Sequence, residues 1–85
     1  MQPSPQPSNS NREFIEFVAR LLARNPDDVQ VTETVEDNVV AYHLSLAPED
    51  VGRVIGREGR IVRAIRSLLR SAAVRQGVRV SLEVG

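Results

Sequence analysis

The chain has 85 residues, the size of one small domain, and it contains no cysteine, so neither disulfides nor thiolate metal sites can stabilise it. It has one histidine and no cluster of acidic residues at metal-ligand spacing, and we expect neither a metal nor another cofactor. No apolar run approaches the roughly 20 residues that a membrane-spanning helix needs. The N-terminus also lacks a signal-peptide pattern, so we expect a soluble, cytoplasmic protein.

The net charge is zero, but the charges are distributed unevenly along the chain. Residues 1–50 carry three arginines against nine acidic residues, a net charge of −6. Residues 51–79 carry eight arginines against Glu58 alone, a net charge of +7. Such asymmetry is typical of a protein with a polyanionic partner such as nucleic acid. The two halves could equally pair their charges within one fold or across a dimer.

The N-terminal segment, residues 1–9, holds three prolines and almost no side chain suited to a core, so we expect a disordered tail that ends by residue 10. Ser10 and Glu13 fit a capping box, which predicts a helix running to about Arg24. We expect both phenylalanines of the chain to pack in the core. The apolar residues of this helix recur at spacings of three and four and predict one buried stripe, formed by Phe14, Ile15, Val18, Leu21 and Leu22.

Two strands are expected next. Valines alternate with polar residues between Val29 and Val35, and a short turn follows at residues 36–38. The second strand places Val40, Tyr42, Leu44 and Leu46 on one face and Val39, Ala41, His43 and Ser45 on the other. The two strands therefore form a hairpin with one buried face. The lone histidine falls on the polar face without an acidic or serine partner at a recognisable spacing, so we expect it to be solvated.

A short helix is predicted after the hairpin. Pro48 suits its first turn, and Glu49 and Asp50 complement its N-terminal dipole. It ends near Ile55, where glycines begin.

The longest helix is predicted over residues 60–76, with Gly77 as its C-terminal cap, and an alternating strand follows over residues 78–84. The helix gathers arginines on one side, and we expect Arg66 and Arg70 there to be simply solvated. We expect the opposite, buried stripe to comprise Ile61, Ala64, Ile65, Leu68 and Ala72. The whole order of elements predicts an α+β domain, in which helices cover one face of a sheet.

The four residues Gly56-Arg57-Glu58-Gly59 separate the last two helices. Glycine can adopt dihedrals closed to other residues and allows its backbone to approach another chain closely. If Arg60 opens a helix, its first amides point toward this loop, where the helix dipole favours an anion such as phosphate. The same glycines would also suit a plain turn between helices, and the loop alone leaves both interpretations open.

The segment from Pro48 to Ile61, with Val-Ile-Gly-x-x-Gly-Arg-Ile at its end, resembles a KH domain, an RNA-binding module. The extra helix and strand before the core are similar to the type II arrangement of bacteria. This segment looks especially like the small bacterial single-KH proteins called KhpA, and so does the segment Asn25-Pro26-Asp27-Asp28. The resemblance covers residues 11–85 and implies one KH domain (α-β-β-α-α-β) with a three-stranded mixed sheet and helices packed on one face.

The resemblance implies that the glycine loop clamps about four nucleotides of single-stranded RNA. Arg57 and Arg60 would lie nearest the phosphates, and the bases would occupy an aliphatic groove whose far wall is the middle strand. Glu58 places a negative charge inside the clamp and would weaken binding. The RNA-binding residues that we expect are Arg53, Val54, Ile55, Gly56, Arg57, Glu58, Gly59, Arg60, Ile61 and Arg63.

The resemblance also implies partners. It suggests an RNA chaperone or post-transcriptional regulator that acts as a homodimer, with a larger KH-containing protein of the Jag/KhpB type as a further partner. It implies neither a membrane nor a small-molecule substrate.

Other functions fit the sequence less well. No nucleophile–base pair or Walker motif is present, so we do not expect an enzyme and assign no catalytic residue. A DNA-binding helix-turn-helix shares the helix–glycine turn–helix pattern, but Ile61, Val62 and Ala64 occupy the positions where it would present base-reading residues. The alternative that remains is a protein-interaction module that keeps the KH fold and binds little RNA, which Glu58 favours.

Overall fold

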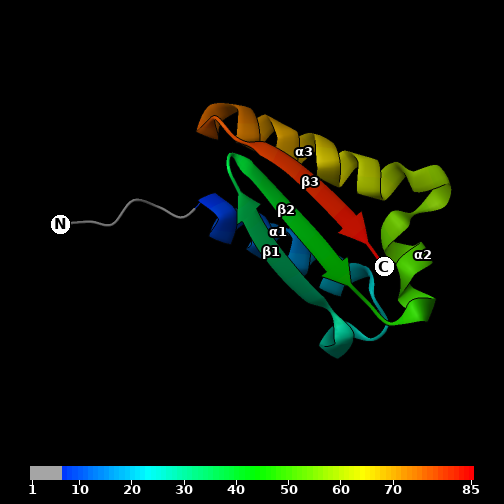
Figure 1. Ribbon diagram of the computed structural model, residues 1–85. Coiled ribbons are helices and arrows are strands. Elements are labelled where there is room, and N and C mark those ends of the chain that lie inside the picture. Colours follow the sequence, from blue (N-terminus) through cyan, green and yellow to red (C-terminus); the bar gives the residue numbers. More distant parts are fainter. Residues whose placement is uncertain (1–6) are drawn as a thin grey trace.

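The computed structural model describes the backbone of residues 7–85 and the side chains of residues 11–85. The order of helices and strands is the predicted α-β-β-α-α-β (Figure 1). In chain order the elements are α1 (Pro7–Leu22), the 3₁₀ turn η1 (Pro26–Asp28), β1 (Gln30–Glu36), β2 (Val39–Ser45), α2 (Pro48–Ile55), the 3₁₀ turn η2 (Arg57–Gly59), α3 (Arg60–Gln76) and β3 (Arg79–Val84).

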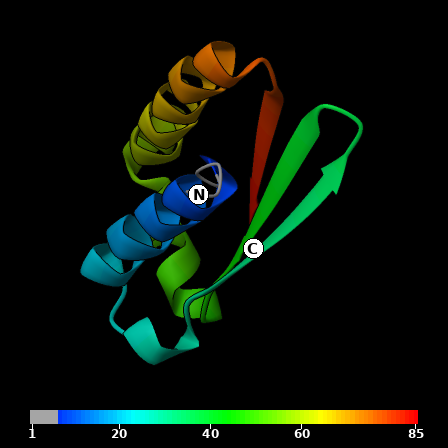
Figure 2. The ribbon, with the colours of Figure 1, turned by 90° about the vertical axis from the view of Figure 1, so that its left-hand side faces the viewer.

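The strands form one mixed sheet in the order β1-β2-β3. β1 runs antiparallel to β2, with Val31 opposite Leu44, and β2 runs parallel to β3, with Tyr42 opposite Leu82. All three labelled helices lie on the same face of this sheet (Figure 2). The predicted two-layer α+β architecture of a type II KH domain is confirmed.

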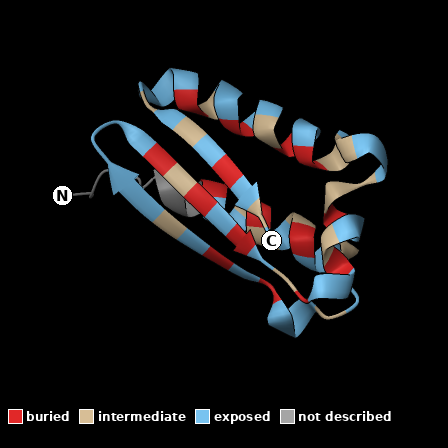
Figure 3. Ribbon diagram, turned by 45° about the vertical axis from the view of Figure 1, so that its right-hand side comes forward, coloured by how far each residue is buried: buried red, intermediate tan, exposed pale blue. Residues whose placement is uncertain are grey.

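The core lies between the helices and the sheet. Burial alternates along β2, as predicted, because successive side chains of a strand point to opposite faces (Figure 3). Tyr42 lies at the centre of the sheet and is 1% exposed. The buried cluster comprises Ile15 and Ala19 of α1, Val54 of α2, Val62, Ile65 and Leu69 of α3, and Val29, Val31, Val40, Tyr42, Leu44 and Leu82 in or next to the sheet.

Helix α1 differs from its prediction at both ends. It begins at Pro7, because the fixed φ of proline suits the first helical position, so the predicted start at Ser10 is wrong. The disordered tail that we predicted therefore overlaps α1 at residues 7–9, and its first part, residues 1–6, lies outside the described residues. The helix ends at Leu22, before the predicted Arg24.

Part of the buried stripe predicted for α1 is also wrong. Phe17 and Leu21 are 63% and 69% exposed, whereas Ile15 and Ala19 are fully buried. Ile15 and Ala19, four residues apart, lie on the buried side of the helix, and Phe17 and Leu21 lie on the opposite, exposed side. One of the two phenylalanines thus lies outside the core.

The buried face of α3 is rotated from the predicted one. The predicted Leu68 is 57% exposed, and the buried residues of α3 are Val62, Ile65, Leu69 and Ala73. Figure 3 shows that the buried segments of α3 face the sheet. Two apolar stripes overlap in this helix and share Ile65, so periodicity alone did not separate them. Arg66 lies at the margin of the buried side, because a long arginine can run its methylene stem along apolar surface and place its charged group at the edge.

Three smaller findings complete the fold. His43 is exposed, and its Nε2 lies 2.9 Å from the carbonyl oxygen of Gly85, to which it donates, so the ring is not merely solvated. Val35 of β1 is 63% exposed and does not continue the buried face of that strand. Among residues 7–85, no helix combines the length and the apolar character that crossing a bilayer requires.

Candidate functional site

The glycine loop has a backbone that few other residues could adopt. Gly56 has φ 80° and ψ 173°, a region that is essentially restricted to glycine. Glu58 and Gly59 both adopt left-handed conformations, with φ 58° and 73°. The chain thereby leaves α2, makes the tight turn η2 and enters α3 without an intervening linker. The predicted loop between two helices is confirmed.

The main-chain amides of the loop divide into two groups. Gly59 N donates to Gly56 O at 3.1 Å, and Arg60 N donates to Arg57 O, so these amides are satisfied within the turn. The structure gives no main-chain acceptor to the amides of Arg57 and Glu58 within the part of the chain that it describes. The sequence argument pointed to the first amides of α3, and the amides of Arg57 and Glu58 in the centre of the loop are further available donors.

The charged side chains of the loop are solvent-exposed. Arg57, Arg60 and Arg63 are exposed on the loop and on the first turn of α3. Glu58 Oε1 lies 3.5 Å from Arg60 Nη2, and both side chains are more than 70% exposed. An exposed ion pair of this kind contributes little to stability. Because the Glu58 carboxylate already contacts Arg60, it competes with any anion for that guanidinium group.

The aliphatic residues that we predicted for the site do not share one environment. Val54 is fully buried in the core, so it supports the loop from below and does not reach the surface. Ile55 and Ile61 are half-buried at the margin of the loop. The strand beside α3 is the edge strand β3, so the far wall is not the middle strand as predicted (Figure 1).

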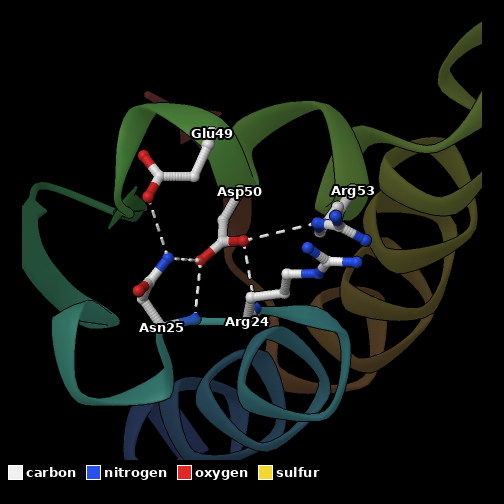
Figure 4. Close-up of polar contacts among 5 residues, drawn as sticks. All are labelled: Arg24, Asn25, Glu49, Asp50 and Arg53. Atoms are coloured by element: carbon white, nitrogen blue, oxygen red, sulfur yellow. Dashed lines mark hydrogen bonds and ion pairs between the residues drawn. The ribbon is translucent and has the colours of Figure 1, made fainter.

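Arg53 is held by a buried carboxylate. Its Nε lies 3.5 Å from Asp50 Oδ1, one helical turn before the loop. Asp50 is 0% exposed and also accepts hydrogen bonds from Arg24 N (3.0 Å), Asn25 N (2.9 Å) and Asn25 Nδ2 (3.0 Å). Figure 4 shows this carboxylate between α2 and the segment that follows α1. Asp50 thus fixes the end of α1 to the helix that carries the glycine loop.

The ionisation of Asp50 follows from these contacts. The main-chain N–H of Arg24 lowers the pKa of the carboxyl below its ordinary value of 3.8, and the two hydrogen bonds from Asn25 act in the same direction. Burial opposes them, and the hydrogen bonds to the charged form prevail. Asp50 is therefore ionised over the neutral pH range.

Sequence reasoning missed two residues near the site, Asp50 and Arg66. The position of Asp50 near the start of α2 suggested only an interaction with the helix dipole, since nothing in the sequence shows that Arg24 and Asn25 fold back onto it. Arg66 donates from Nε (3.3 Å) and Nη2 (2.9 Å) to the carbonyl oxygen of Leu82, and it is half-buried rather than solvated as predicted. Among the described residues, no group of three or more histidine or acidic side chains is placed to hold a metal ion.

Comparison with known proteins places this geometry in a family. The family model described as KhpA/KhpB, KH domain matches residues 12–84. An "RNA-binding protein KhpA" from Chlamydia pneumoniae is 42% identical over 73 residues, which cover 86% of this chain and 94% of the relative. Proteins with the same name from Clostridium acetobutylicum (41% over 73 residues; 86% of this chain, 97% of the relative) and Caldanaerobacter subterraneus (42% over 72 residues; 85% and 96%) are similar to the same extent. The matches span nearly the whole chain, and the chain belongs to the KhpA/KhpB family of KH domains.

Proposed function

We propose that this domain binds single-stranded RNA, and that the loop from Gly56 to Gly59 clamps the backbone of about four nucleotides. The observation that carries the proposal is the loop itself, which presents, among exposed arginines, two amides that have no main-chain acceptor in the described part of the chain. Backbone N–H groups aimed at one point form a binding site for phosphate oxygens. The name of the relatives, RNA-binding protein KhpA, supports RNA as the polyanion.

Each residue of the site has a role in this proposal. The amides of Arg57 and Glu58 hold a phosphate, and the Arg57 and Arg60 guanidinium groups neutralise its charge. Arg63 and Arg53 extend the positive surface on either side of the loop. Ile55 and Ile61 offer half-buried apolar surface to a base, and Val54 supports the loop from the core. The protein performs no catalysis, and it acts in the cytoplasm as an RNA chaperone or a post-transcriptional regulator.

The test is a titration of labelled single-stranded RNA at low salt. The double variant Arg57→Asp with Glu58→Asp should lose binding while its circular dichroism stays unchanged, because two exposed acids at the amides repel phosphate. Arg75→Asp is a matched control, since it changes the net charge equally but lies ~22 Å along α3 from the loop. Binding by the double variant at the affinity of the control would remove the loop from the mechanism.

A second function, pairing with another protein, is favoured by the apolar surface that the fold leaves open. Phe17 and Leu21 are exposed on α1, and Leu68 is exposed on α3. A dimer would also place two clamps on one RNA, which raises affinity through effective concentration. We propose that the domain pairs with a second copy of itself and with a larger KH-containing protein of the Jag/KhpB type.

Sedimentation of the wild type should show a dimer that dissociates on dilution. Two variants locate the surface: the single variant Leu68→Ser on α3 and the double variant Phe17→Ser with Leu21→Ser on α1. Only the variant whose residues lie in the interface should weaken the dimer. A wild type that remains monomeric at high concentration would exclude self-pairing. A variant that loses the dimer and keeps RNA binding would separate the interaction function from the RNA-binding function.

A further inference from the structure

The edge strand β3 exposes a row of main-chain groups beside α3. Arg79 N donates to Asn38 O (2.8 Å) and Gly85 N donates to Leu44 O (3.0 Å), so the odd-numbered residues of this segment pair with β2. In a parallel ladder the intervening residues direct their N–H and C=O groups away from the partner strand. The main-chain groups of Val80, Leu82 and Val84 therefore face outward.

The guanidinium group of Arg66 reaches this edge from α3. Its Nε and Nη2 both donate to Leu82 O, at 3.3 and 2.9 Å, which holds the side chain between helix and strand. An arginine has five N–H donors in a planar fork, and this contact uses two of them. One donor on Nη2 and both on Nη1 remain available at the far end of the fork.

A hollow of about 220 Å³ lies at this position. It is bordered by Arg66 and Arg70 of α3 and by Val80, Ser81 and Leu82 of β3. Arg66 is six residues from the start of α3, which places it about 9 Å along the helix axis from the glycine loop. A strand whose backbone is clamped at the loop therefore has bases within reach of the hollow.

Resting on the proposed RNA binding, we propose that Arg66 determines base specificity, and that it selects guanine for the hollow between α3 and β3. The free end of its fork matches the O6 and N7 acceptors of guanine, which arginine recognises with two parallel hydrogen bonds. Single-stranded RNA presents this edge, because its bases are not stacked in a duplex. The contact with Leu82 fixes the plane of the guanidinium group and lowers the entropy cost of recognition.

The test compares a short uridine strand with the same strand carrying one central guanosine. The wild type should bind the guanosine strand about tenfold more tightly. Arg66→Lys should lose this preference and keep the affinity for the uridine strand, because lysine retains the charge but lacks the fork. Arg75→Lys is the matched control, since Arg75 is exposed on the same helix but borders neither the glycine loop nor the hollow, and it should keep the preference.

A third strand makes the test independent of any change in the protein. Replacing guanosine by 7-deazaguanosine removes the N7 acceptor but keeps O6, and should reduce the preference of the wild type. Equal affinity of the wild type for the guanosine and uridine strands would overturn the inference, as would a preference that survives in Arg66→Lys or that is undiminished with 7-deazaguanosine. An Arg66→Lys variant that melts earlier and loses affinity for both strands equally would show a structural role for Arg66 and overturn it as well. Failure of the wild type to bind any strand through its loop would instead refute the proposed function itself.

Discussion

Ile61 lies so close over Gly56 that a Cβ atom at residue 56 would come within 2.7 Å of Ile61 Cγ1. Real Cβ atoms do not approach a neighbour to this distance. The first helical turn of α3 thus packs on the backbone that leaves α2, and the two glycine positions of the loop have different reasons to be glycine. At Gly59 a Cβ atom would have space, since the nearest atom would be 4.0 Å away, so only the left-handed backbone conformation favours glycine there.

Gly56→Ala should therefore be the most destabilising alanine substitution among the glycines of this region. We expect a loss of about 3 kcal/mol in the free energy of unfolding, since the backbone region excludes alanine and the methyl group overlaps Ile61. Gly59→Ala should cost about 1 kcal/mol, because only the left-handed backbone opposes it. Gly52→Ala, in α2 with open space around it, should stabilise by about 0.5–1 kcal/mol. Urea unfolding of the three variants measures this order, and equal losses at Gly56 and Gly59 would contradict the steric argument.

Glu58→Lys should raise the affinity for single-stranded RNA. The substitution frees Arg60 from its 3.5 Å ion pair and adds a positive charge within the clamp. Each added phosphate contact on a single strand steepens the dependence of log K on log salt by about 0.7. Titrations at several salt concentrations measure this slope. Glu36→Lys is the control, because it makes the same change in net charge at the exposed end of β1, and an equal gain in that variant would show that net charge alone is responsible.

The fold was predictable from the sequence because its strongest signals are local. Alternating valines, Pro48 at the start of α2, the loop glycines and Gly77 each act through their neighbours along the chain, and the structure confirms the elements that they predicted. Contacts between distant segments were not predictable in this way. The sheet, not the helix itself, decides whether α3 buries Leu68 or Leu69.

The site shows the same division. The loop and its exposed arginines follow from the sequence pattern, whereas the burial of Val54 depends on packing from other elements. Asp50 was missed because its partners, Arg24 and Asn25, lie 26 and 25 residues away along the chain. In the sequence Arg66 resembles the solvated arginines beside it, and only its contact with the edge of β3 distinguishes it.

Asp50→Asn should lower the melting temperature by several degrees. The amide would present N–H hydrogens where the main-chain amides of Arg24 and Asn25 now donate, and the charge that these contacts stabilise would be absent. Glu49→Gln is the control, since Glu49 is exposed and, within residues 11–85, accepts one hydrogen bond, from Asn25 Nδ2 at 3.1 Å. If the two variants melt at the same temperature, the buried carboxylate is not what fixes α1 to α2.

The same carboxylate predicts part of the acid sensitivity of the fold. Because the pKa of Asp50 is lower in the folded state than its ordinary value of 3.8, its contribution to stability is complete well above pH 3.8 and is lost as the pH falls below it. This loss is measured as the free energy of urea unfolding between about pH 6 and pH 3, roughly the range in which carboxyl groups titrate. Asp50→Asn should show a smaller decline than the wild type, and an identical decline in both would contradict the assignment.

Tyr42 should make the fold sensitive to alkali. Burial raises the pKa of its hydroxyl from 10.0 to about 12, and the negative charge of Glu33 acts in the same direction, while a hydrogen bond with Asn11 opposes them. The folded state thus holds this proton more tightly than the unfolded state, so stability is full below pH 10.0 and falls as the pH rises toward 12.

The composition of the chain makes this titration simple to measure. Tyr42 is the only tyrosine, and the chain has no cysteine and no lysine, so no other side chain titrates in this range. Tyrosinate absorbance should rise with a midpoint near pH 12 in the folded protein and near 10.0 in urea. Tyr42→Phe should remove the decline of unfolding free energy between these pH values. A folded-state midpoint near 10.0 would mean that the hydroxyl is open to solvent, against its 1% exposure in the core.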